Sequence, residues 1–148
     1  MEKDVIISIK GVQRYENADP DTMELVTAGR LEREGNSYTL SYQESELTGL
    51  EGTLTTFQIE PERITLMRVG EFNSQMVFQE GRRHMSMYNT PYGAMTIGVN
   101  TRHLLAELDD QGGEIEIDYA IEIDHSVAGR NTFQINVKEA EGAAGLRI

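Results

Sequence analysis

Six polar and aromatic side chains stand at or beyond the ends of segments whose alternate positions are apolar. In the segment 37–46, every second residue reads Tyr, Leu, Tyr, Glu, Glu, so one face begins apolar and ends with two carboxylates. In 63–69 the corresponding face begins with isoleucine and leucine and ends with arginine. Hydroxyls, carboxylates and a guanidinium above an apolar floor are the groups that orient a small ligand in a pocket. The candidate ligand-binding residues are Tyr42, Glu44, Glu46, Arg68, Tyr88 and Tyr92.

The same residues also have a purely structural interpretation. The two glutamates and Arg68 can form cross-strand ion pairs, each worth under about 1 kcal/mol at a surface. The tyrosines can be core residues whose hydroxyls reach its edge. A fully buried pair between Arg68 and a glutamate would favour the functional interpretation, because a buried charge is costly unless it is well paired. The methionines from Met67 to Met95 either fill the core or line an adaptable apolar pocket.

No pattern in the sequence identifies a reaction. His84, His103 and His125 lie about 20 residues apart, which is no local metal-ligand spacing. The sequence has no cysteine, so disulfides, thiol catalysis and cysteine-bound zinc are excluded. It also lacks the G-x-S-x-G motif of serine hydrolases. We therefore assign no catalytic residue, no metal and no cofactor, and an enzyme ranks last among the functional interpretations.

One long segment indicates the kind of element that holds these residues. From Gly113 to Asp124 the odd positions are isoleucine or tyrosine after the first glycine, and the even positions are acidic apart from one alanine. Successive side chains of a strand point to opposite faces, so this segment has one apolar and one charged face. A helix, with a period near 3.6 residues, would mix the two kinds. The pattern predicts a long strand of a curved antiparallel sheet.

The rest of the chain divides into similar runs separated by Gly, Pro, Asn and Asp. We expect hairpins at Gly35-Asn36 and at Glu60-Pro61-Glu62. Thr101–Leu108 is either a short helix capped by Thr101 or a strand paired with the long one, and the strand is favoured. The other predicted strands are Val5–Gln13, Met23–Glu34, Ser37–Glu46, Thr53–Ile59, Arg63–Val69, Asn73–Phe78, Arg83–Asn89, Ala94–Val99, Gly113–Asp124 and Asn131–Glu139.

Short links favour antiparallel neighbours in sequence order, and a sheet of this size removes its two exposed edges by closing. We predict an all-β fold: a single closed antiparallel up-and-down barrel of about 8–10 strands. The barrel domain spans residues 1–140, and residues 141–148 form a flexible tail.

The composition of the chain argues against two classes of binding partner, nucleic acids and membranes. The chain of 148 residues carries a formal net charge of −12, which opposes binding to a nucleic-acid backbone. The compact basic cluster Arg82-Arg83-His84 is interpreted as a solvated strand start. No segment approaches the ~18 apolar residues of a membrane helix, and the first residues lack a signal-peptide pattern. We expect a cytoplasmic protein with no nucleic-acid or membrane partner.

Three segments, in this order and spacing, carry a family resemblance. They are Tyr42 to Thr53, then Arg68-Val69-Gly70 with Met76-Val77-Phe78 and Gly81, then Tyr88 to Met95. Together they resemble the YwiB-like family of small bacterial proteins, over about Val5 to Glu139. The resemblance implies a calycin-type, lipocalin-like β-barrel and carries no catalytic residues across.

A barrel of about eight strands is either filled by side chains or holds one small ligand. We expect a binding barrel for a small apolar or amphipathic molecule. The alternative is a ligand-free, filled barrel that acts through its surface or as a homodimer.

Overall fold

The computed structural model describes residues 1–140 except 16–17, 47–48, 72, 91–92 and 125, and describes only the backbone at 87–90. The predicted tail at 141–148 lies outside the described residues. The strands are β1 (Glu2–Arg14), β2 (Asp21–Glu34), β3 (Ser37–Gln43), β4 (Thr53–Ile59), β5 (Ile64–Gly70), β6 (Ser74–Phe78), β7 (Arg83–Thr90), β8 (Gly93–Asp109), β9 (Gly112–Ile123) and β10 (Ser126–Glu139).

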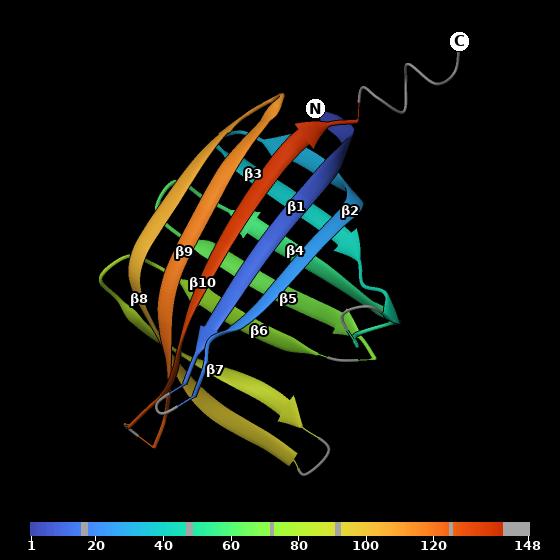
Figure 1. Cartoon of the computed structure of the whole chain (residues 1–148). Helices are drawn as coiled ribbons and strands as arrows, with labels where there is room; N and C mark the ends of the chain where they lie inside the picture. The colour runs from blue at the N-terminus through green and yellow to red at the C-terminus, as the bar shows by residue number, and fades with distance from the viewer. Residues whose placement is uncertain (16–17, 47–48, 72, 91–92, 125, 141–148) are drawn as a thin grey trace.

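The strands form one closed sheet. Each pairs antiparallel with its neighbours in sequence, and β1 also pairs with β10, so the circuit closes (Figure 1). The order around the barrel is β1-β10-β9-β8-β7-β6-β5-β4-β3-β2. This confirms the predicted all-β, up-and-down antiparallel barrel. In Figure 1 the wall made by β1, β9 and β10 crosses in front of the wall made by β3 to β6.

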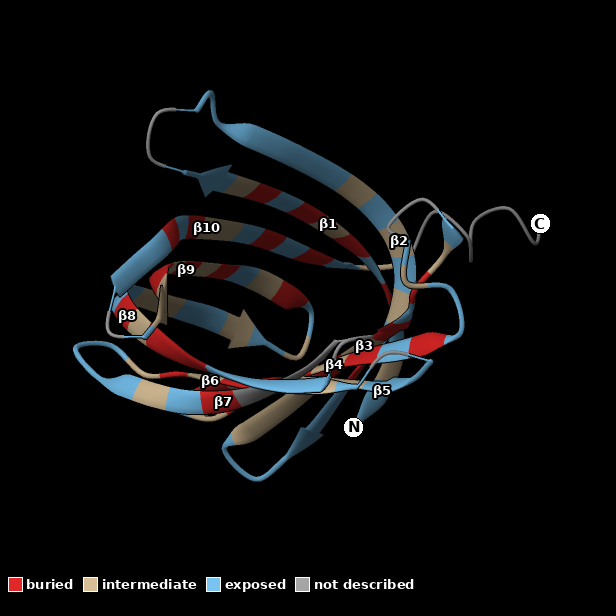
Figure 2. Ribbon diagram, turned by 90° about the horizontal axis from the view of Figure 1, so that it is seen from below, coloured by how far each residue is buried: buried red, intermediate tan, exposed pale blue. Residues whose placement is uncertain are grey.

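The alternating pattern of β9 sets which side faces inward. Ile115 and Ile117 are fully buried and Tyr119 is 4% exposed, whereas the acidic residues between them are more accessible. Buried and more accessible residues alternate along β1, β4 and β10 as well, and Figure 2 shows the alternation along β1 and β10. Burying these side chains removes apolar surface from water at about 25 cal/mol per Å². The shared core therefore holds the walls together.

Strand β8 differs from its prediction in length. It runs from Gly93 to Asp109 as one strand and so joins two predicted segments, Ala94–Val99 and Thr101–Leu108. Its register shifts between Thr101 and His103, which marks a β-bulge. The bulge moves the inward positions from odd to even numbers, so Thr101 is buried and Leu104 is the next to pack on the core. That change of parity explains why the apolar spacing also fitted a helix.

The two predicted hairpin turns are confirmed, and a third turn requires glycine. Gly35-Asn36 joins β2 to β3, and the turn at 60–62 joins β4 to β5. At the β8–β9 turn, Gly113 has φ of +147°, a conformation that other residues rarely adopt. A Cβ atom there would lie 1.9 Å from the carbonyl oxygen of Glu107. The close approach of β8 and β9 beside this turn therefore depends on the missing side chain.

At one end of the barrel, two local features of the strands differ from a regular sheet. Strand β3 ends at Gln43, before the predicted end at Glu46, although the Glu44 amide still donates to the Thr53 carbonyl over 2.9 Å. Between β6 and β7, the register of the described residues pairs Ser74 with Tyr88. Among the described residues no helix is both long and apolar enough to cross a membrane.

Candidate functional site

The up-and-down topology brings polar residues from different strands to one end of the barrel. Odd-numbered strands end there and even-numbered strands begin there, and we call this end the mouth. Figure 2 is seen from below Figure 1, from the side of the mouth. Cross-strand partners run in a row from Tyr42 on β3 through Thr55 on β4 and Arg68 on β5 to Ser74 on β6. Directly opposed residues of an antiparallel sheet share a face, so this row faces the lumen.

A buried carboxylate lies beside this row. The Glu44 side chain is 1% exposed and the Arg68 side chain 20%. The Thr55 hydroxyl donates to Glu44 Oε2 over 2.5 Å, and Arg68 Nε lies 3.8 Å from the same oxygen. The Nε atom is buried and has no hydrogen-bond acceptor among the described residues. The pair therefore balances charge inside the barrel, although the Arg68 Nε–H makes no hydrogen bond to any described residue.

Tyr42 completes the cluster on the side of Glu44. Burial is the main reason why the pKa of its phenol is raised, and the negative charge of Glu44 adds to the effect, while the positive charge of Arg68 acts against it. The phenol is therefore protonated at neutral pH and serves as a hydrogen-bond donor. With Thr55 it surrounds the Glu44 carboxylate with hydroxyl groups, which lowers the cost of burying that charge.

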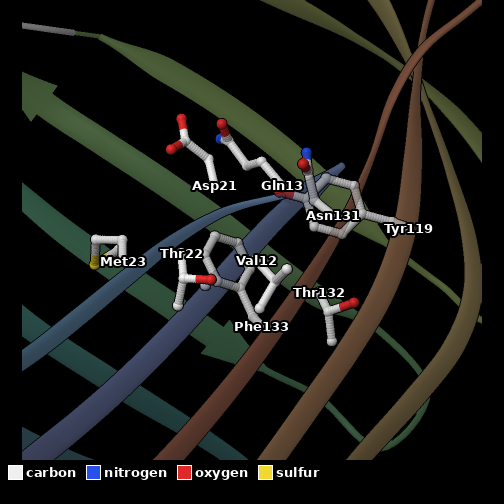
Figure 3. A pocket seen from close by; sticks show the side chains of 10 residues that line it. Val12, Gln13, Asp21, Thr22, Met23, Tyr119, Asn131, Thr132 and Phe133 are labelled. Atoms are coloured by element: carbon white, nitrogen blue, oxygen red, sulfur yellow. The ribbon is translucent and has the colours of Figure 1, made fainter. Parts of the chain in front are cut away.

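A second polar row crosses the opposite wall at the same mouth. The register pairs Asp21 on β2 with Gln13 on β1, Gln13 with Asn131 on β10, and Asn131 with Tyr119 on β9. Figure 3 shows the polar ends of Asp21, Gln13 and Asn131 along these neighbouring strands. Asn131 is 7% exposed, and the Tyr15 hydroxyl donates to Gln13 Oε1 over 2.9 Å. Two side-chain amides therefore face the arginine wall across the lumen.

Two adjoining cavities lie between these walls. The inner cavity, of about 230 Å³, takes its walls from β1, β5, β6, β8, β9 and β10, so it lies within the lumen. The rim cavity, of about 320 Å³, lies over β1, β2, β9 and β10 (Figure 3). They share four lining residues, which are Gln13, Tyr119, Asn131 and Phe133.

The inner cavity is apolar apart from a few groups. Its floor includes Leu66, Met76 and Ile97, and Arg68 is the one charged residue among the described residues that line it. The Tyr119 ring packs between two phenylalanine rings, with centroids 4.7 Å from Phe78 and 5.8 Å from Phe133. Tilted aromatic contacts of this kind fix ring positions. An apolar space with a few convergent polar groups is the usual form of a small-molecule site.

The structure brings together three of the six predicted site residues. Tyr42, Glu44 and Arg68 form the buried cluster, and Arg68 lines the inner cavity. Glu46 is exposed beyond the end of β3. Tyr92 lies outside the described residues, and Tyr88 is described only by its backbone, which pairs with Ser74. Ligand binding by these six residues stays a prediction.

Sequence reasoning missed the amide row. Gln13 and Asn131 belong to the same kind of pattern that singled out Glu44, because the inward face of β1 reads Val5, Ile7, Ile9, Gly11 and then Gln13. The signal was present, but the pairing of β1 with β10 was needed to place the two amides together.

The polar groups outside these two rows do not form a comparable candidate site among the described residues. Arg82 and Arg83 are exposed, and Arg83 Nε lies 2.5 Å from Glu122 Oε1, which fits the interpretation of that cluster as a solvated strand start. His84 contacts Gln79 over 3.1 Å and His103 lies 3.3 Å from Glu80. Within the described residues, no three acidic or histidine side chains group closely enough to hold a metal ion.

Comparison with known proteins agrees with this architecture. The profile of the family described as "Domain of unknown function (DUF1934)" matches residues 7–135. This chain belongs to that family. The crystal structure of the ywiB protein from Bacillus subtilis superposes with a TM-score of 0.82 at 20% sequence identity, over 94% of this chain and 93% of that one. At that identity the likeness shows a shared fold. No curated protein matches the chain.

Proposed function

We propose that this protein binds a small amphipathic molecule at the mouth of the barrel, with its apolar part in the inner cavity. The observation that carries the proposal is an apolar cavity inside the lumen at which Arg68 is the one charged residue among the described lining residues. The Arg68 side chain is 20% exposed, so part of its guanidinium can donate a hydrogen bond to a ligand oxygen.

The cavity size bounds the ligand. At roughly 30 Å³ for each water-sized group, the 230 Å³ inner cavity holds about eight non-hydrogen atoms. A longer molecule would extend into the rim cavity past Tyr119 and Phe133, which line both spaces. Met76 and Met95 line the inner cavity, and their unbranched side chains adapt to ligands of different shape.

The alternative function, a filled barrel acting through its surface or as a homodimer, draws support from exposed apolar side chains. Val26 is 71% exposed, Val69 63% and Met85 60%. They lie on three separate strands, β2, β5 and β7, and the two cavities favour the binding function over a filled barrel. The surface function therefore ranks second.

Native mass spectrometry of protein purified without detergent tests the choice. The binding function expects a small-molecule adduct on the monomer that is released when the protein is denatured. A dimer without any adduct, together with no response to added amphipathic probes, would support the surface function instead.

A further inference from the structure

We propose that the inner cavity selects amphipathic molecules whose polar group is an uncharged hydrogen-bond acceptor, such as a primary amide, over carboxylates of the same shape. This inference rests on the proposed binding function and names the chemical class of the ligand. It follows from the charge that already surrounds Arg68.

The polar group of the ligand has one charged partner among the described residues that line the cavity. Arg68 lines the inner cavity, and its side chain is 20% exposed, so part of the guanidinium can donate to a ligand. A carbonyl oxygen or a carboxylate oxygen could accept a hydrogen bond from it. The choice between them is therefore electrostatic.

The carboxylate of Glu44 already offsets the positive charge of Arg68. The Glu44 carboxylate lies 3.8 Å from Arg68 Nε, and its side chain is 1% exposed. Among the described residues that line the cavity, Arg68 is the one cation. A ligand carboxylate would therefore place a second negative charge beside Glu44 with no further cation to offset it, and like charges in a poorly solvated site repel strongly. A neutral carbonyl accepts the hydrogen bond without that repulsion.

The mouth adds to the discrimination. Asp21 lies in the polar row at the rim, and the whole chain carries a net charge of −12, so anions approach against the field. The facing wall carries the amides of Gln13 and Asn131, which both line the inner cavity. Side-chain amides donate and accept hydrogen bonds, so they can pair with both ends of a ligand amide, whereas a carboxylate can only accept.

Hexanamide and hexanoate form a matched pair of probes, since they have the same shape and the size of the inner cavity and differ in charge. Binding to the full-length protein at neutral pH is followed by NMR titration of methyl resonances. We expect hexanamide to bind at least about tenfold more tightly than hexanoate. Equal or tighter binding of hexanoate would overturn this inference but leave the binding function standing. If neither probe binds, both proposals are overturned.

Glu44→Gln tests the cause of the selectivity. The substitution removes the negative charge and leaves Arg68 unbalanced, so the affinity for hexanoate should rise about tenfold and that for hexanamide should stay within about twofold. The matched control is Glu51→Gln, which removes the same charge from an exposed position in the β3–β4 connection and should change neither affinity. If Glu44→Gln leaves hexanoate binding unchanged, or if Glu51→Gln has the same effect, the inference is wrong. Should Glu44→Gln fail to fold, the comparison of the two probes on the parent protein still decides.

Discussion

Arg68 Nε and Glu44 Oε2 lie 3.8 Å apart inside the barrel, close enough for an ion pair, but Nε makes no hydrogen bond within the described part of the chain. The carboxylate is meanwhile held by the Thr55 hydroxyl. The pair therefore neutralises charge without using all of the guanidinium. A buried charge pair in which one donor makes no hydrogen bond costs stability.

Arg68→Ala should lower the free energy of unfolding by about 3 kcal/mol, because it leaves the Glu44 carboxylate buried without its cation. Urea denaturation measures the loss. The matched control is Arg63→Ala, which breaks the exposed ion pair with Glu60 at 3.3 Å and should cost under about 1 kcal/mol.

A second variant separates loss of charge balance from loss of packing. Replacing both partners, Arg68→Met with Glu44→Leu, should recover most of the stability, since no unpaired charge is then buried. Equal losses from Arg68→Ala and Arg63→Ala, or no recovery in the double variant, would show that the pair does not matter to the fold.

Tyr42→Phe should make stability less sensitive to alkaline pH. Burial and the nearby Glu44 raise the pKa of Tyr42 in the folded protein, and unfolding returns it to about 10. The folded state thus holds this proton more tightly, so the contribution is complete below about pH 10 and is lost as the pH rises further, by up to about 1.4 kcal/mol per pH unit.

Urea denaturation of the parent and Tyr42→Phe between about pH 9 and pH 11 checks this expectation. Part of the decline should remain in the variant, because burial and a hydrogen bond to Asp110 also raise the pKa of Tyr38. A decline as steep in the variant as in the parent would count against the buried position of Tyr42.

Gly113→Ala should be severely destabilising, by several kcal/mol. The new Cβ atom would meet the Glu107 carbonyl oxygen at 1.9 Å in a backbone conformation with φ of +147°. Gly35→Ala is the control, since Gly35 also has a positive φ, of +62°, but no atom lies within 4 Å of the added Cβ. That variant should lose only the ~1–2 kcal/mol of a left-handed residue with a side chain. Thermal melting compares the two, and similar losses would contradict the close approach at the β8–β9 turn.

Met95→Trp should block binding with little effect on stability. Met95 lines the inner cavity but is 37% exposed, so a larger ring can enter the cavity from the mouth without displacing the core. Met85→Trp makes the same change at a 60% exposed site outside the residues that line the cavity. Titration with hexanamide should show binding to Met85→Trp and none to Met95→Trp. Unimpaired binding to Met95→Trp would place the ligand elsewhere.

The barrel was predictable because one face of each strand repeats with period two. In β9 the inward residues Ile115, Ile117 and Tyr119 alternate with acidic ones, and the turn at Gly35-Asn36 carries its own local signal. The unpredicted length of β8 has a local cause, since the bulge after Thr101 breaks the alternation that sequence patterns detect.

Only one wall of the candidate site could be predicted from the sequence, because the other wall depends on the pairing of β1 with β10. Tyr42, Glu44 and Arg68 follow apolar runs on neighbouring hairpins, so their proximity could be inferred from chain order. The facing amides, Gln13 and Asn131, are separated by most of the chain and meet only because β1 pairs with β10. No local pattern encodes that closure, so the second wall of the cavity emerged only from the fold.

Ligand binding inside the barrel requires an accessible lumen, and NMR with methyl-labelled protein tests this accessibility directly. On addition of hexanamide, the methyl resonances of Met76 and Ile97, which line the inner cavity, should shift and saturate together, while that of exposed Met85 should not move. Lumen resonances that stay fixed at saturating probe, or a Met85 resonance that moves with them, would contradict binding inside the barrel.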